Sequence, residues 1–301
     1  MKAKVVVVGS LNMDLVARAE RLPRPGETLA GETFFTVPGG KGANQAVAVA
    51  RLGGTVAMVG NVGDDAYGQQ LRQALEVEGI DCQAVKVCEG VSSGVALITV
   101  DAASQNCIVI IPGGNGLLTP QAVQQFDGLL QAAEVIICQL EVPADTVAWT
   151  LARGRELGKT MILNPAPATG PLPTQWLAHI DYLAPNESEA QALTGVPVSD
   201  LDSARRAGER LVQLGVRKVI ITLGAHGALL VCAQGSRHFP APKVKALDTT
   251  AAGDTFIGGF AAALVRGLTE DAAIAFGQRA AALSVTRAGA QPSIPYLKEL
   301  P

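Results

Sequence analysis

The sequence predicts an α/β fold: a single three-layer α/β/α domain with a mostly parallel central sheet and a small β-sheet lid. Short runs rich in β-branched residues alternate with longer segments of helical periodicity, which is typical of parallel strands joined by helices. The strand runs are continuously apolar, as expected for a sheet covered on both faces. Residues 11–38 and 92–111 break this rhythm and predict the lid.

The expected elements follow from these two patterns. The predicted strands are short and apolar, and they cover residues 5–9, 56–60, 135–139, 160–163, 182–185, 219–223 and 228–232. The predicted helices have apolar residues at helical spacing, and they cover residues 42–52, 65–78, 120–132, 145–157, 202–214 and 255–266. Gly53, Gly79, Gly158 and Gly215 follow periodic segments, where helices commonly end in a left-handed residue.

The two exceptional stretches both look like antiparallel sheet. Residues 11–38 contain prolines and glycines but no convincing helix, and residues 92–111 alternate as strand, turn and strand over 95–100 and 107–111. We expect one added sheet over the carboxyl ends of the main strands. Because no linker or repeat divides the chain, we expect a single domain over residues 1–301, with a lid formed by about 11–38 and 92–111.

Composition excludes several classes of protein. Hydrophobic residues make up 48% and charged residues 17% of the chain, so a sizeable core can form. The net charge is −3 and no Lys or Arg run exceeds two residues, so we expect no nucleic-acid partner. No apolar run approaches the roughly 18 residues of a membrane span, and the four-residue apolar run near the N-terminus is too short for a signal peptide. We expect no membrane partner and a cytoplasmic location.

Cysteine and histidine give no sign of a metal site. The five cysteines are scattered without C-x-x-C spacing, at Cys82, Cys88, Cys107, Cys138 and Cys232. We interpret them as reduced core residues of a cytoplasmic protein. His179 and His238 have no partner pattern for a metal, and His226 is expected on a solvent-facing turn.

The strongest chemical signal runs from Asp248 to Phe256 and precedes a helix of small residues. Ala251, Ala252 and Gly253 allow several backbone N–H groups to point outward together, at a helix start that favours negative charge. Asp254 can take a proton from a substrate hydroxyl, the role of an Asp base in phosphoryl transfer. The alternative is that Asp254 only caps the helix and that Gly253 only makes a turn.

A second glycine-rich segment, Gly39 to Ala46, opens another predicted helix. Gly-Gly permits close approach of the backbone to a ligand, and Lys41 and Asn44 supply directional donors for hydroxyl oxygens. It is not a Walker P-loop, because the G-x-x-x-x-G-K-[ST] spacing is absent. The alternative is a solvated helix start at which Lys41 faces water.

Polar residues also follow the predicted strands. Asn12 and Asp14 come after the first strand and share a face of extended chain, and Glu141 follows the strand 135–139. Ligands of open α/β sheets bind at such carboxyl ends, although an ordinary polar turn is the alternative. Asn186 and Glu189 start a helix after another strand, where they could approach a phosphate, and the glycines of 222–227 permit contact with an adenine. The alternatives there are a helix cap and a hairpin turn.

Together these motifs resemble the ribokinase family of carbohydrate kinases, also called the phosphofructokinase-B family. The resemblance covers nearly the whole chain, and its most specific parts are Gly39–Asn44 and Asp248–Asp254. Further likeness lies in Gly9–Asp14, Asn164–Ala168 and Thr286–Ser293. The resemblance implies ATP-dependent phosphorylation of the primary hydroxyl of a small sugar, and the pattern is most similar to the branch that acts on D-ribose to give D-ribose 5-phosphate.

The resemblance also implies roles for individual residues. Asp254 would be the catalytic base, and Ala251, Ala252 and Gly253 would form the anion hole. Sugar contacts would come from Asn12, Met13, Asp14, Gly40, Lys41, Gly42, Ala43, Asn44 and Glu141. Nucleotide contacts would come from Asn186, Thr222, Leu223, Gly224, Ala225, His226, Gly227, Gly253, Asp254 and Gln278, and Glu189 would organise Mg²⁺ through water. A monovalent cation, K⁺, would be bound mostly by backbone carbonyls of Asp248, Thr250, Ser284, Arg287, Gly289 and Ser293.

The resemblance further suggests a homodimer paired through the lids, whose strands would otherwise be unprotected edges. Two positions depart from the wider family: Ala251 replaces a common Gly, as in the D-ribose branch, and Gln278 stands where relatives often have His or Asn. Alternatives are a kinase for 2-deoxyribose, fructose or a nucleoside, although 4% aromatic residues disfavour stacking on a base. A non-catalytic sugar or nucleotide sensor would be expected to lose the base or the anion hole. A dinucleotide dehydrogenase is disfavoured because no G-x-G-x-x-G follows the first strand.

Overall fold

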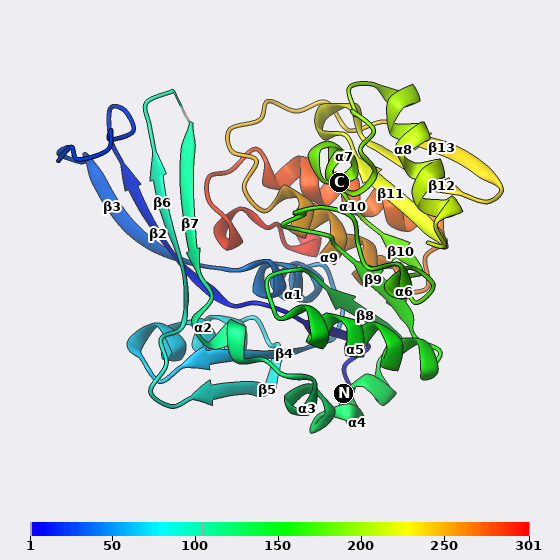
Figure 1. Ribbon diagram of the computed structural model, residues 1–301, viewed down its shortest axis with the longest axis horizontal. Helices are drawn as coiled ribbons and strands as arrows, with labels where there is room; N and C mark the ends of the chain where they lie inside the picture. Colours follow the sequence, from blue (N-terminus) through cyan, green and yellow to red (C-terminus); the bar gives the residue numbers. More distant parts are fainter. Residues whose placement is uncertain (1, 104, 301) are drawn as a thin grey trace.

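The computed structural model describes residues 2–103 and 105–300, which form two sheets and the helices packed around the larger one (Figure 1). The larger sheet has nine strands in the order β13-β12-β11-β10-β9-β8-β1-β4-β5. Their bounds are β1 (Val5–Val8), β4 (Val56–Gly63), β5 (Asp81–Cys88), β8 (Val135–Cys138), β9 (Thr160–Leu163), β10 (Tyr182–Leu183), β11 (Lys218–Thr222), β12 (Ala228–Cys232) and β13 (Gly235–Phe239). All neighbours pair in parallel except β11–β12 and β12–β13.

Helices cover both faces of this sheet and bury two separate apolar clusters. Alternate residues of a strand point to opposite faces, so Val5 and Val7 belong to one cluster whereas Val6 and Val8 belong to the other. The helices, with their bounds, are α1 (Lys41–Arg51), α2 (Ala66–Val77), α3 (Pro120–Gln124), α4 (Asp127–Ala132), α5 (Ala144–Glu156), α6 (Thr174–Leu177), α7 (Glu187–Thr194), α8 (Leu201–Gln213), α9 (Ala252–Val265) and α10 (Glu270–Ser284). The result is the predicted three-layer α/β/α arrangement, which confirms the fold class.

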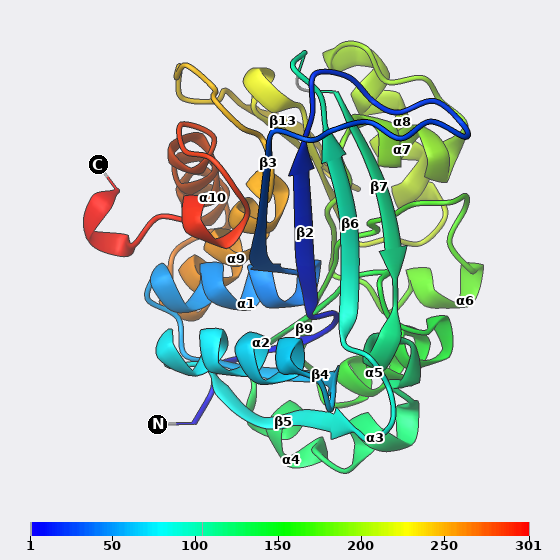
Figure 2. The same cartoon turned by 90° about the vertical axis from the view of Figure 1, so that its left-hand side faces the viewer.

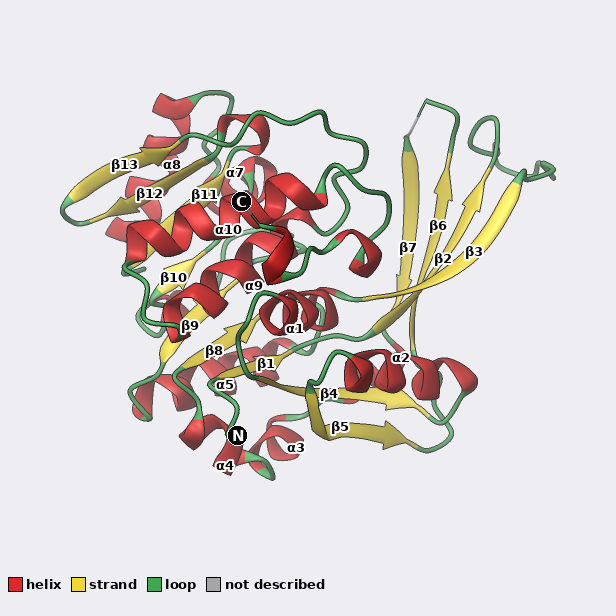
Figure 3. Cartoon of the chain, turned by 180° about the vertical axis from the view of Figure 1, so that it is seen from behind, coloured by secondary structure: helices red, strands yellow, loops and turns green. Residues whose placement is uncertain are grey.

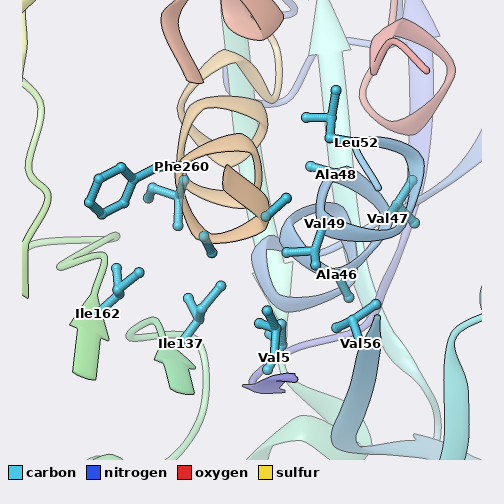
Figure 4. Packing of buried hydrophobic residues seen from close by; sticks show 14 of the residues in the cluster. Val5, Ala46, Val47, Ala48, Val49, Leu52, Val56, Ile137, Ile162 and Phe260 are labelled. Carbon is cyan, nitrogen blue, oxygen red and sulfur yellow. The ribbon is translucent and has the colours of Figure 1, made fainter. Parts of the chain in front are cut away.

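Helices α1, α9 and α10 lie side by side on one face of the sheet (Figure 3). Glycine makes this close packing possible: a Cβ on Gly258 would lie 2.4 Å from the Cβ of Ala48, and one on Gly277 would lie 2.7 Å from the carbonyl oxygen of Phe256. Val5 of β1 and Phe260 of α9 pack in the same layer as the apolar side of α1 (Figure 4). The tight contact fixes the starts of α1 and α9 relative to each other.

The smaller sheet contains β2 (Asn12–Arg18), β3 (Thr33–Gly39), β6 (Gly94–Val100) and β7 (Asn106–Ile111), in the order β3-β2-β6-β7 (Figure 2). We predicted an antiparallel sheet, and this is wrong for one pair, because β2 and β6 are parallel. Asn12 and Gly94 begin these strands and are paired in register. The two strands therefore leave the larger sheet from the same place and run in the same direction.

Some expected elements differ from the structure. The helix predicted over 120–132 is two helices, α3 and α4, because the chain breaks at Phe126, whose side chain packs on the second core cluster. Strands β5 and β13 were missed because exposed residues interrupt their apolar pattern. Helix α10 was missed because its small apolar residues occur on most of its sides. Among the described residues, no helix is long and apolar enough to cross a bilayer.

The cysteines are all free, as predicted. Cys82 and Cys138 are buried, and burial raises the pKa of their thiols to about 11 and about 12. The prediction of a core position is wrong for Cys107, which is exposed on β7 at the edge of the smaller sheet. The apolar run around Cys107 belongs to a sheet face that no other described element covers, rather than to the core.

Candidate active site

The predicted sugar and phosphate motifs meet where α1 and α9 begin. Helix α1 starts after Gly40, whose φ is 87°, and a Cβ there would lie only 2.7 Å from the backbone nitrogen of Asn12. Helix α9 starts after Ala251, whose φ of 57° is left-handed. The N-cap residues Gly40 and Ala251 make no side-chain cap, so the first N–H groups of each helix depend on other partners, and the positive end of each helix dipole lies at the site.

Asp254 lies in the first turn of α9 and is only 7% exposed. Asn44 Nδ2 donates to Asp254 Oδ2 at 3.1 Å, and Gln45 Nε2 donates to Asp254 Oδ1 at 2.9 Å. Both oxygens of the carboxylate are thus held by amides from α1. The Oδ1 atom of Asn44 is buried and has no hydrogen-bond partner within the described chain. An acceptor remains available beside the carboxylate.

Glu141 holds the start of α1 from the neighbouring strand end. Its Oε2 accepts a hydrogen bond from Ser10 Oγ at 2.5 Å and another from the backbone N–H of Lys41 at 3.1 Å. Ser10 Oγ in turn accepts from the N–H of Gly42 at 3.3 Å. Sequence reasoning did not assign Ser10 a role, although its position directly after β1 was visible.

The electrostatics of the site are dominated by carboxylates around one lysine. Burial raises the pKa of Asp14 to about 7, with further contributions from Glu141 and Asp254. Burial alone would lower the pKa of Lys41, but the negative charges of Asp254, Glu141 and Glu189 outweigh it, and the net shift is upward. Lys41 is therefore kept in its charged form by the surrounding carboxylates, and its positive charge can attract an anionic ligand.

The remaining predicted sugar residues divide into two groups. Asn12 is buried, and its Oδ1 accepts a hydrogen bond from Asn115 Nδ2 at 2.8 Å. Asn115 also bonds the N–H and the carbonyl of Leu11, each at 2.9 Å, so it fixes the chain where β2 begins. We did not predict Asn115, although the polar Gly-Gly-Asn-Gly turn around it was a usable signal. Met13 and Ala43 pack in the core, which leaves only their backbones for a ligand.

A cavity of about 180 Å³ lies beside Asp254. Its walls combine the starts of α1, α7 and α9 with the ends of β9, β10 and β11, and its lining residues are Lys41, Asn164, Ala166, Ala184, Asn186, Glu189, Thr222, Thr249, Ala251, Ala252, Gly253, Asp254 and Ile257. The structure therefore gathers the predicted base, the predicted anion hole and part of the predicted nucleotide group around one space. Asn164, Ala166, Ala184, Thr249 and Ile257 were not predicted as site residues.

The residues predicted to approach nucleotide and Mg²⁺ also serve as helix caps. Asn186 Oδ1 accepts from the N–H of Glu189 at 2.8 Å, and Glu189 Oε2 accepts from the N–H of Asn186 at 2.9 Å, a complete capping box. Both side chains still line the cavity, and burial raises the pKa of Glu189. Among the described residues, no cluster of three His, Cys, Asp or Glu side chains could hold a metal. The two carboxylates that line the cavity, Glu189 and Asp254, nevertheless fit Mg²⁺, which is commonly held by few carboxylates, waters and substrate phosphates.

The Thr222–Gly227 turn extends from the cavity toward solvent. Thr222 lines the cavity and His226 is exposed, as expected for a turn residue. A Cβ on Gly227 would lie 2.9 Å from Gln278 Nε2, which places Gln278 beside this turn. The Nε2 of Gln278 donates to the carbonyl of Phe239 at 2.6 Å. One of the two hydrogens of that amide is therefore used within the protein.

The two segments predicted to bind a monovalent cation lie together, joined by Asp248. One carboxylate oxygen of Asp248 accepts from the N–H and hydroxyl of Thr250, at 2.9 and 2.6 Å, and the other accepts from the N–H of Gly289 at 2.8 Å. These bonds lower the pKa of Asp248 although partial burial opposes them. The hydroxyls of Ser284 and Ser293 donate to the carbonyls of Ala281 and Ala290. Arg287 pairs with Glu299 instead of Asp248.

Comparison with known proteins decides the family. The model of the pfkB family carbohydrate kinases matches residues 2–297. The chain belongs to this family. It is therefore a carbohydrate kinase, and the resemblance inferred from its motifs is confirmed.

Several relatives match along nearly their whole length. Ribokinase of Haemophilus influenzae is 42% identical over 299 residues, which cover 99% of this chain and 97% of that protein. Deoxyribokinase of Salmonella typhi is 40% identical over 295 residues, which cover 98% of this chain and 96% of that protein. The crystal structure of ribokinase from Thermotoga maritima has a TM-score of 0.90 at 39% identity, with coverage of 99% and 97%. The structure of Arabidopsis thaliana ribokinase complexed with ribose and ATP has a TM-score of 0.93 at 33% identity, and the match covers 99% of this chain and 97% of that chain.

Proposed function

We propose that this kinase transfers the γ-phosphoryl group of ATP to the primary hydroxyl of D-ribose and forms D-ribose 5-phosphate. The observation that carries the proposal is Asp254: a buried carboxylate, held through both oxygens, at the uncapped start of α9 beside a cavity. The similarity to a ribokinase complexed with ribose and ATP supports the choice of substrates.

In the proposed mechanism, Asp254 accepts the proton of the primary hydroxyl as that oxygen attacks the γ-phosphorus, while the bond between the γ-phosphorus and the β–γ bridging oxygen breaks and ADP leaves. The backbone N–H groups of Ala251, Ala252 and Gly253 would stabilise the charge on the transferred group, because they lie at the start of α9; the N–H of Ala252 would first have to leave the carbonyl of Thr249, to which it donates at 3.2 Å. Lys41 adds a positive charge, because the neighbouring carboxylates raise the pKa of its amino group and keep that group protonated. Mg²⁺, when bound, neutralises phosphate charge, and Glu189 would hold its water shell.

The sugar side of the proposed site is rich in hydrogen-bond acceptors. Asp14, Glu141 and Asn44 Oδ1, which has no partner among the described residues, can accept from sugar hydroxyls, while Asn12 and Lys41 add donors. Gly39 leaves room for this arrangement, since a Cβ there would lie 2.4 Å from Asp14 Oδ2. A small polyol satisfies many such groups at once. The deoxyribokinase relative makes 2-deoxyribose the second candidate acceptor.

We further propose that K⁺ binds between the segments around Asp248 and Gly289, mostly through backbone carbonyls. The contact of Asp248 with Gly289 supports this site, because it joins the turn before α9 to a distant loop. The fixed turn would carry Ala251 and Asp254. The ion would act through structure, without touching the sugar.

We also propose that the whole chain acts as one cytoplasmic kinase domain, with the smaller sheet as a lid and as the contact of a homodimer. The exposed side chains of this sheet are strongly apolar: Phe34 is 65%, Val109 56% and Ile108 49% exposed. A surface of this kind is typical of a protein interface. Neither nucleic acid nor a membrane is part of the proposed function.

A coupled assay of ADP release over a sugar panel tests the substrate. D-ribose is expected to give the highest kcat/KM among D-ribose, 2-deoxyribose, fructose and adenosine. Each missing hydroxyl leaves a buried polar group unpaired, which corresponds to a loss of about tenfold. A clear preference for 2-deoxyribose or adenosine would reject D-ribose as the substrate while leaving the kinase assignment intact.

A further inference from the structure

Gln45 is a buried residue of α1 that contacts Asp254 without facing the cavity. Its side chain is fully buried, and it is not among the described residues that line the cavity. Its Nε2 lies 2.9 Å from Asp254 Oδ1 and 3.2 Å from Asn164 Oδ1. A residue in this position can influence the carboxylate but cannot bind the substrate.

The orientation of the Gln45 amide is fixed by its surroundings. Asn164 Nδ2 donates to the carbonyl of Ala184 at 3.1 Å, which turns Asn164 Oδ1 toward Gln45. Both neighbours of this end of Gln45 are therefore acceptors, and only the amide nitrogen can face them. Its oxygen then faces the other way and accepts from Gln139 Nε2 at 2.6 Å. The three side chains therefore form one chain of hydrogen bonds, in which the amide of Gln139 donates to that of Gln45 and the amide of Gln45 donates to the carboxylate of Asp254.

Gln139 is held at some energetic cost. It is fully buried, and its Oε1 has no hydrogen-bond partner within residues 2–103 and 105–300. That oxygen occupies the space beside Gly9, where a Cβ would lie 2.0 Å from it. Burying an unpaired amide oxygen is unfavourable, and such costs are commonly retained at functional sites. Glycine at position 9 is what makes room for Gln139.

We propose that Gln45, supported by Gln139, is a positioning residue that holds Asp254 in the orientation needed to accept the substrate proton. The proposal rests on the proposed function, because it takes Asp254 as the base. Asn44 alone would hold one oxygen and leave the carboxylate more freedom to rotate about its χ2 bond. The second contact, from Gln45 to Oδ1, removes this freedom. Around the carboxylate lie the charged groups of Asp14, Lys41, Glu141 and Glu189, and none of them makes this bond.

The test compares Gln45→Met and Gln139→Met with Thr150→Val. Met keeps the length of Gln and removes its amide, whereas Thr150→Val removes a buried hydrogen bond to Thr146 in the other helix layer. Gln45→Met is expected to lower kcat roughly 10- to 100-fold, because a misplaced catalytic group loses about that much. Gln139→Met is expected to lower kcat less. The Kd for the sugar substrate, measured by calorimetry, is expected to stay within about threefold in all variants, and kcat is expected to be unchanged in Thr150→Val.

A double-mutant cycle separates positioning from general destabilisation. In the Asp254→Asn background, Gln45→Met is expected to cause no further loss of kcat, because its effect passes through the carboxylate. The proposal would be overturned if Gln45→Met lowered kcat equally in the wild-type and Asp254→Asn backgrounds. It would also be overturned if Gln45→Met alone kept kcat within twofold of the wild-type value. If Asp254→Asn itself keeps more than a tenth of kcat, the proposed base fails instead. Should Gln45→Met not fold, the same cycle with Gln139→Met decides the question.

Discussion

Helices α1 and α9 begin in a different way from helices α7 and α8. Each of the latter pair has a complete capping box within its own first turn, Asn186 with Glu189 and Asp200 with Ser203. Helix α1 begins after Gly40 and helix α9 after the left-handed Ala251, and neither of these two residues makes a side-chain cap. A capping box satisfies the N–H groups of a helix from nearby residues, so its formation depends little on the rest of the fold.

The start of α1 depends instead on distant parts of the chain. Its first N–H groups donate to Glu141 and Ser10, which are 100 and 32 residues away in the sequence. The turn before α9 is joined to Gly289, 41 residues away from Asp248. The local cap of α8 thus stabilises a helix outside the cavity and that of α7 forms part of the cavity wall, whereas the starts of α1 and α9 beside Asp254 are positioned by tertiary contacts. The site is correspondingly sensitive to changes outside it.

The largest effect is expected from Asp254→Asn at the start of α9. Asn has nearly the same shape as Asp but is a poor proton acceptor, so we expect kcat to fall about 10²- to 10⁴-fold. Affinity for the sugar is expected to stay within about an order of magnitude, because a base acts chiefly in the transition state. Steady-state kinetics and calorimetric Kd values check both expectations. A variant that retains more than a tenth of wild-type kcat would contradict the role of Asp254.

A smaller effect is expected from removing the cation that we propose beside Asp248. Rates in K⁺ are expected to exceed those in Na⁺ or in choline at equal ionic strength by roughly 5- to 100-fold, the usual range of coupling between two sites. The reason is that the ion would fix the turn carrying Ala251. Asp248→Asn keeps an acceptor for Thr250 but loses the charge, so the response to K⁺ should shrink in this variant. Equal rates in all three salts would leave Asp248 as a cap of its turn and nothing more.

The same distinction explains how far the sequence predicts the molecule. Continuous apolar runs predicted seven strands of the larger sheet. Local signals at strand ends and helix starts singled out residues that lie at the cavity, such as Asp254 and Lys41. Local signals did not single out Gln45, Gln139 and Asn115, because each of them acts through contacts with residues that lie 94 to 209 positions away in the sequence. The parallel pairing of β2 with β6 was missed for the same reason. Patterns along the chain do not reveal which distant amides will meet in the core.

The smallest effect, confined to stability, is expected from Asp200→Ala at the start of α8. Asp200 Oδ1 accepts from the N–H and the hydroxyl of Ser203, at 2.7 and 2.6 Å, and these bonds hold the pKa of Asp200 below its ordinary value. Loss of a helix cap is expected to lower Tm by roughly 1 to 4 °C. The value of kcat should not change, because this cap is formed within α8 and lies outside the cavity.

The dependence of this Tm difference on pH follows from the direction of the pKa shift. A group whose pKa is lowered by folding stabilises the protein above its unfolded pKa, about 3.9 for Asp, and this stabilisation is lost as the pH falls through the lower folded value. Melting curves of wild type and Asp200→Ala should therefore differ at pH 7 and converge as the pH is lowered toward 3. A Tm difference that stays constant over this range would show that the charged carboxylate is not what caps α8. A fall in kcat would show that the locally capped start of α8 also controls the site from outside the cavity, and its contrast with α1 and α9 would be lost.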